Sequence, residues 1–132
     1  MALQVIDTDV CSYLYKESDE AEFYEPHLSG NILIISFQTQ AELLRWALSA
    51  GWGPRRREQL KAYLQHYVIE GSSDVLSLRW AEAMESGRRN GRPIAAADAW
   101  IAATALYLDA PLITHNRKHF TGIDGLMVIS EA

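Results

Sequence analysis

The hydrophobic positions of the chain form short apolar runs separated by longer segments with helical spacing. Residues 3–6, 32–36, 111–114 and 126–129 are mainly apolar runs that predict buried strands. Residues 32–36 (ILIIS) show no alternation of apolar and polar side chains, which is typical of a strand covered on both faces. Val68 and Ile69 indicate a further, minor strand.

The segments between these runs predict helices. They extend from Thr8 or Asp9 through Tyr15, over residues 20–28 and 39–50, from Pro54 through Tyr67, from Ser73 or Asp74 to about residue 86, and from Pro93 to residue 108. The strands alternate with helices, and the chain has no internal repeat or linker. We therefore expect one domain over residues 1–132, with a three-layer α/β/α sandwich around a mostly parallel sheet.

One acidic residue stands out in the helical segment 94–108, because Asp98 is its only charge. A carboxylate in apolar surroundings costs several kcal/mol unless it is paired, hydrogen-bonded, neutralised or bound to a cation. A structural interpretation is that Asp98 serves the free N–H groups of the first helical turn. If Pro93 is the first helical residue, however, Asp98 lies beyond that turn and this interpretation weakens. Both interpretations stay open at this point.

Three more polar residues have positions similar to that of Asp98. Asp7 and Asn116 follow predicted strands, and Glu42 and Asp98 lie near the starts of predicted helices. In a parallel sheet these positions meet at one edge, where α/β folds bind ligands. Oxygen side chains of this kind hold hard cations such as Mg²⁺ or Mn²⁺ next to a substrate phosphate. The pattern therefore indicates phosphoryl transfer. For Glu42 a structural alternative exists, because Thr39 and Glu42 have the spacing of a capping box.

Charge and composition limit the remaining classes. A net charge of -5 argues against a uniformly nucleic-acid-binding surface, although basic residues cluster at 55–57, 88–92 and 117–118. These clusters are interpreted as solvated helix ends or loops, with phosphate contacts as the alternative. The single cysteine, Cys11, excludes an intramolecular disulfide and a thiolate metal cluster. Neither a membrane span nor a signal peptide is apparent, so we expect a soluble, cytoplasmic protein.

Four segments of the chain resemble, in order, the motifs of the PIN-domain ribonucleases and more narrowly of the VapC-like toxins. They are residues 5–10 (VIDTDV), 35–36 with 41–44 (IS and AELL), 93–94 with 98–105 (PI and DAWIAATA), and 114–116 with Phe120 (THN and F). The third segment is the most specific of the four. Together they span almost the whole chain.

The resemblance implies a metal-dependent endoribonuclease that acts as the toxin of a toxin–antitoxin pair. It assigns metal binding and catalysis to Asp7, Glu42 and Asp98, with Mg²⁺ or Mn²⁺ as the ion. The supporting residues are Asp9, Thr114 and Asn116. Asn116 and His119 fall where many relatives have acids, so the resemblance leaves the number of ions open. It also implies an RNA substrate, a cognate antitoxin protein and a homodimer.

Other classes of protein share parts of this pattern. A PIN-like module with weak catalysis could bind RNA or protein without cleaving it. Asp7 and Asp9 after a strand also resemble the first motif of haloacid-dehalogenase-like phosphatases, in which the first Asp is the nucleophile, but no later acidic pair is present. A receiver domain is disfavoured because the central run 32–36 ends in Ser36 rather than an acceptor Asp.

Overall fold

Five short strands form one sheet in the order β3-β2-β1-β4-β5, and every neighbouring pair is parallel. This computed structural model describes residues 1–132. The strands are β1 (Leu3–Ile6), β2 (Ile32–Ser36), β3 (Val68–Glu70), β4 (Leu112–Ile113) and β5 (Val128–Ile129). The α-helices are α1 (Thr8–Lys16), α2 (Asp19–Leu28), α3 (Phe37–Ser49), α4 (Pro54–Leu64), α5 (Asp74–Arg89) and α6 (Ala96–Leu108), and a 3₁₀ helix, η1, covers Arg117–Phe120.

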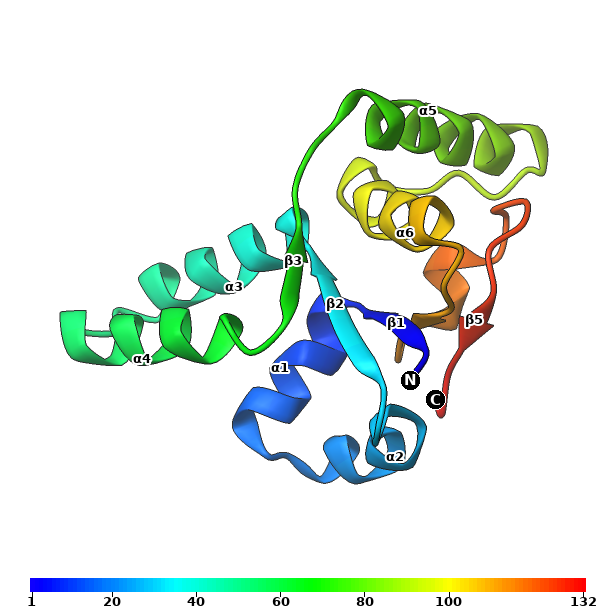
Figure 1. Cartoon of the computed structure of the whole chain (residues 1–132). Coiled ribbons are helices and arrows are strands. Elements are labelled where there is room, and N and C mark those ends of the chain that lie inside the picture. The colour runs from blue at the N-terminus through cyan, green and yellow to red at the C-terminus, as the bar shows by residue number, and fades with distance from the viewer.

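Alternate residues of the central strands face two separate apolar cores. Val5, Ile34 and Leu112 belong to the core that contains the buried residues of α5 and α6. The next residue of each strand belongs to the opposite core, which contains side chains of α1 to α4. The sheet is thus the middle layer between α5 and α6 on one face and the other helices on the opposite face (Figure 1). The predicted three-layer fold with a parallel sheet is confirmed.

Two helices begin earlier than the sequence predicts. Asp7, rather than Thr8 or Asp9, is the N-cap of α1. Ser36 is the N-cap of α3, and its Oγ accepts a hydrogen bond from the backbone N–H of Gln38 at 3.1 Å. Both caps thus lie at the end of the preceding strand: Ser36 is the last residue of β2, and Asp7 follows β1 directly. The predicted capping box of Thr39 and Glu42 is wrong, because α3 is already in its second turn at Glu42.

Helix α6 begins later than the sequence predicts. Its N-cap is Ala95, so Asp98 is the third helical residue and lies in the first turn. The segment before the helix is held elsewhere: the Arg92 N–H donates to the Gly87 carbonyl at 2.8 Å, and Ile94 is buried in the core beneath α5 and α6. Pro93 therefore lies in a connecting segment that packs against the core and does not begin the helix.

None of the helices combines the length and the apolar character that crossing a membrane would require.

The close approach of Gly122 to the segment before α6 gives a test of this fold. An added Cβ at Gly122 would lie 2.8 Å from the Cβ and 3.0 Å from the carbonyl oxygen of Arg92. We expect Gly122→Ala to lower the free energy of unfolding by about 1–3 kcal/mol through overpacking, measured by urea denaturation. Gly71→Ala is the matched control, because nothing lies within 4 Å of its added Cβ. Equal stabilities of the two variants would contradict this packing.

Candidate functional site

The carboxyl ends of β1 and β4 and the N-terminal parts of α1, α3 and α6 meet at an acidic pocket of about 210 Å³. Its lining residues are Asp7, Thr8, Asp9, Glu42, Asp98, Ile101, Asn116, His119 and Phe120. The structure thus brings together all four acidic residues that the sequence analysis identified as candidates. Asn116 lines the same pocket. Four carboxylates in one small pocket give it a strongly negative character.

Asp7 is the most constrained of these residues. Its side chain is almost fully buried, with 4 % exposure. Its Oδ1 accepts from the Val10 N–H at 2.9 Å, and its Oδ2 accepts from the Thr114 hydroxyl. The Thr114 Oγ1 in turn accepts from the Asn116 N–H at 2.9 Å. Asp7 therefore joins the end of β1 to the segment after β4, and Thr114 is the supporting residue in this contact.

Glu42 is held by two threonines that the sequence analysis did not identify as site residues. The Thr8 hydroxyl donates to Glu42 Oε1 at 3.0 Å, and the Thr39 Oγ1 lies 3.0 Å from the Thr8 Oγ1. Because the single Thr8 proton goes to Glu42, the Thr39 hydroxyl is the donor to Thr8. The two hydroxyls fix Glu42 at the pocket. Thr39 stands one helical turn before Glu42 in the sequence, and this spacing was the available signal.

The two remaining carboxylates are paired with side chains from the segment after β4. The Asn116 Nδ2 donates to Asp9 Oδ2. His119 Nδ1 lies 3.3 Å from Asp98 Oδ2 at the rim of the pocket. Asp98 is half-buried, and α6 places it in the helical turn where a negative charge is favourable. This placement agrees with the structural interpretation of Asp98, and its functional role stays a prediction.

Burial and nearby negative charges disfavour the charged forms of Asp7 and Asp98. Burial raises the pKa of Asp7 from its ordinary 3.8 to about 7. Hydrogen bonds from Thr114 and Val10 lower this pKa, whereas the negative charges of Asp9 and Asp98 raise it further. Burial also raises the pKa of Asp98, and its contact with His119 opposes that rise. A bound cation would relieve the unfavourable charge on both residues.

The donor atoms of the pocket suit a hard divalent cation. Carboxylate oxygens predominate, as Mg²⁺ and Mn²⁺ prefer. The carboxylates contact protein donors, however, and no three acidic or histidine side chains converge at ligand distances. The pocket fits the ion in its chemistry, and binding requires some side chains to turn toward a common point.

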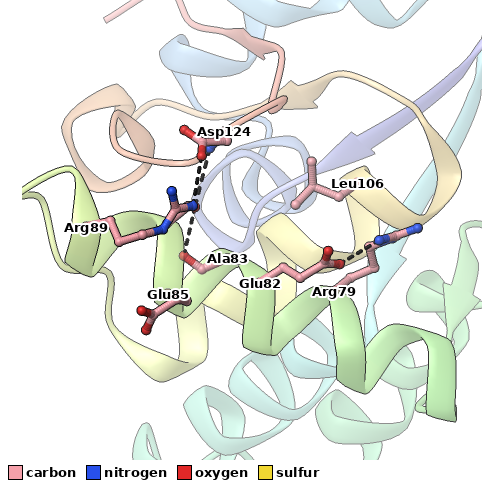
Figure 2. A pocket seen from close by; sticks show the side chains of 8 residues that line it. Arg79, Glu82, Ala83, Glu85, Arg89, Leu106 and Asp124 are labelled. Carbon is pink, nitrogen blue, oxygen red and sulfur yellow. Dashed lines mark hydrogen bonds and ion pairs between the residues drawn. The ribbon is translucent and has the colours of Figure 1, made fainter.

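A second pocket, of about 380 Å³, lies between α5, Leu106 of α6 and Asp124 (Figure 2). Its charged residues are paired with one another: Arg79 contacts Glu82 at 2.5 Å and Arg89 contacts Asp124 at 3.0 Å. It also contains Leu106, which is two turns along α6 from Asp98. This pocket has no free charge and is remote from the strand ends, so it is not the candidate site.

The fold and the acidic pocket define a class of α/β proteins with a cation-attracting site at the carboxyl edge of a parallel sheet. Comparison with known proteins identifies the family. The PIN domain matches residues 5–126, and the chain belongs to the PIN domain family. The resemblance found in the four sequence motifs is confirmed.

Known relatives agree with this assignment over nearly the full chain. Ribonuclease VapC1 of Haemophilus influenzae (strain R2866) is 30 % identical over 126 residues, which cover 94 % of each sequence. The solved structure of VapBC-1 from nontypeable Haemophilus influenzae has 27 % identity and a TM-score of 0.77, with 98 % of both chains covered. VapBC2 from Rickettsia felis, bound to a promoter DNA fragment, has 24 % identity and a TM-score of 0.80, covers 98 % of this chain and 99 % of that one, and supports the fold.

The raised pKa of Asp7 predicts a pH dependence of stability. The folded state favours the neutral carboxyl of Asp7. The stabilisation that Asp7 gives to the folded state is therefore complete below pH 3.8 and is lost as the pH rises toward 7. In wild type, the ionisation of Asp7 lowers the free energy of unfolding by up to about 1.4 kcal/mol for each unit of rising pH between these two values. We expect this decrease to be absent in Asp7→Asn when both proteins are measured in EDTA. The variant should be the more stable protein at pH 8 and similar to wild type at pH 4. Denaturant titrations at several pH values measure this difference, and parallel curves would contradict it.

Proposed function

We propose that this protein, as one domain over residues 1–132, is a divalent-metal-dependent endoribonuclease and the toxin of a toxin–antitoxin pair. The observation that carries the proposal is the meeting of Asp7, Glu42 and Asp98 in one acidic pocket of a PIN domain. The name of the relative Ribonuclease VapC1 supports the choice of RNA as the substrate.

Asp7, Glu42 and Asp98 are the proposed ligands of the ion, which is Mg²⁺ or Mn²⁺. When bound, such an ion supplies positive charge that offsets the charge gained by the phosphodiester and lowers the pKa of water. Thr114 and Thr8 keep the Asp7 and Glu42 carboxylates in place through their hydroxyl groups. Asn116 supports Asp9 through its side-chain amide, which donates to Asp9 Oδ2. The ligands thus come from three different elements and are fixed by neighbouring polar side chains.

The chemical step is hydrolysis of a phosphodiester, in which water adds to phosphorus and the leaving oxygen takes a proton. The Glu42 or Asp98 carboxylate orients the attacking water and accepts its proton. Glu42 accepts a hydrogen bond only through Oε1, which leaves Oε2 free for this task. Asp7 does not suit this role, because both of its oxygens already accept hydrogen bonds from protein groups. The same hydrogen bonds hold the Asp7 carboxylate in place and give no support to the phosphatase alternative with Asp7 as nucleophile.

Two basic residues next to the pocket provide a contact for the RNA backbone. Arg117 and Lys118 follow Asn116 directly, are exposed, and form no ion pair within the protein. Free cationic side chains beside an acidic pocket can hold flanking phosphates while the scissile phosphate enters. An acidic protein can therefore bind RNA locally despite its net charge of -5.

The proposed partner is a cognate antitoxin, and the proposed assembly is a homodimer in the cytoplasm. The solved relatives from Haemophilus influenzae and Rickettsia felis are described as VapBC, and the complex from Klebsiella pneumoniae as toxin–antitoxin. A pocket with four carboxylates also attracts a competing cation. An antitoxin arginine placed there would satisfy the carboxylates and exclude the metal ion.

Loss of a site carboxylate should abolish cleavage without unfolding the protein. We expect Asp98→Asn and Glu42→Gln to lower the rate of Mg²⁺- or Mn²⁺-dependent RNA cleavage by about 10²-fold or more. The measurement is end mapping of a structured total RNA pool treated with the antitoxin-free protein. EDTA should give the same loss in wild type.

The matched control for these variants is Glu82→Gln in the second pocket. Glu82 is exposed and pairs with Arg79 at the surface, where such a pair contributes little. This variant should keep full activity. Cleavage that persists in Asp98→Asn, or metal binding without any cleavage, would favour the alternative of a PIN-like module that only binds RNA or protein.

The hydroxyl of Thr8 should matter through Glu42. We expect Thr8→Val to lower the cleavage rate about 10- to 100-fold, because removing a group that orients a metal ligand has effects of this size. Thr8→Ser is the matched control, since it keeps the donor to Glu42 Oε1. Equal rates for the two variants would show that the hydroxyl has no role in the reaction.

A further inference from the structure

His119 introduces a nitrogen donor into a pocket whose other polar side chains offer oxygen atoms or the Asn116 amide. It belongs to η1 and lines the pocket beside Asp98. Its Nδ1 lies 3.3 Å from Asp98 Oδ2. The imidazole is more than half exposed, with 58 % of the side chain accessible. A solvent ion can therefore reach it.

The backbone around His119 keeps the imidazole at this place. The His119 N–H donates to the Asn116 carbonyl at 3.0 Å within η1. The next residue, Phe120, is buried with 3 % exposure and belongs to the core under α6. An anchored neighbour and a short helix limit the positions that the ring can adopt. Its approach to Asp98 thus follows from the fold and not only from attraction between the two side chains.

The distance between His119 and Asp98 suits two ligands of one ion. Ligands of an octahedral ion lie at about 2.1 Å from it, so two adjacent ligand atoms are roughly 3 Å apart. The observed separation of 3.3 Å between Nδ1 and Oδ2 is close to that value. No lysine or arginine lines the pocket to compete for the carboxylates. Because Nδ1 and Oδ2 face each other in this contact, both side chains must turn so that the two atoms point to one shared ion.

We propose that His119 is a metal ligand together with Asp98, and that its nitrogen makes this site select Mn²⁺ over Mg²⁺. The inference rests on the proposed function, because it takes the acidic pocket as the metal site. Mg²⁺ is a hard ion that takes oxygen ligands and retains its water. Mn²⁺ also takes oxygen ligands but, as a first-row transition-metal ion, accepts an imidazole nitrogen more readily than Mg²⁺ does. A mixed nitrogen and oxygen donor set therefore favours the transition metal. Replacing the imidazole by a carboxylate should restore a site suited to Mg²⁺.

The test is metal binding to the full-length protein without RNA. In wild type, pulsed electron paramagnetic resonance of bound Mn²⁺ should show coupling to a ligand ¹⁴N nucleus. We expect His119→Asp to remove this coupling and to reduce the ratio of Mn²⁺ to Mg²⁺ affinity, measured by calorimetric competition, about tenfold or more. His66→Asn is the matched control, because His66 is an exposed histidine on a different part of the chain. It should keep both the coupling and the ratio.

The outcomes separate this inference from the proposed function. Mn²⁺ that binds without nitrogen coupling, or an affinity ratio that is equal in wild type and His119→Asp, would overturn the role of His119 and leave the nuclease proposal intact. If no ion bound, or if binding were the same in Asp98→Asn, the metal basis of the proposed function would fail and His119 would lose its role with it. Circular dichroism of each variant checks that the fold is unchanged.

Discussion

The hydrogen bonds of the buried Asp7 carboxylate are the constraint on which the site depends. Thr114 and the Val10 N–H hold its two oxygens, so one side chain connects the end of β1, the start of α1 and the segment after β4. A buried carboxyl without such donors would cost several kcal/mol. With them, Asp7 still has a pKa raised to about 7 by burial. The arrangement fixes the site and leaves its charge only partly compensated.

This incomplete compensation is the physical basis for attracting a cation. Each acid of the pocket has a neutral or weakly basic protein partner: threonine hydroxyls for Asp7 and Glu42, an amide for Asp9 and an imidazole for Asp98. Such partners orient a carboxylate without cancelling its charge, as a lysine or arginine would. The charged pairs Arg79–Glu82 and Arg89–Asp124 line the second pocket instead. The two pockets thus differ in that only the second has arginine partners for its carboxylates.

Much of the fold could be predicted because the strands are short apolar runs, and such runs are buried in the sheet of an α/β protein. The run 32–36 is a strand with these limits, and Asp98 and Glu42 are on helices as expected. The starts of helices α1, α3 and α6 were wrong by one to three residues. Those boundaries depend on which polar group meets the first free N–H groups, and on the packing of Ile94, which local sequence does not specify.

The sequence alone determined the parallel layered architecture, the family and the acids that gather at one edge, because hydrophobic period and short motifs are local properties. Only the tertiary structure decided which side chains touch. Thr8 contacts Glu42 across 34 residues, Thr114 contacts Asp7 across 107, and His119 contacts Asp98 from a separate 3₁₀ helix. These contacts arise where β1, α3, α6 and the end of β4 pack together, and that packing depends on the whole core rather than on any one segment.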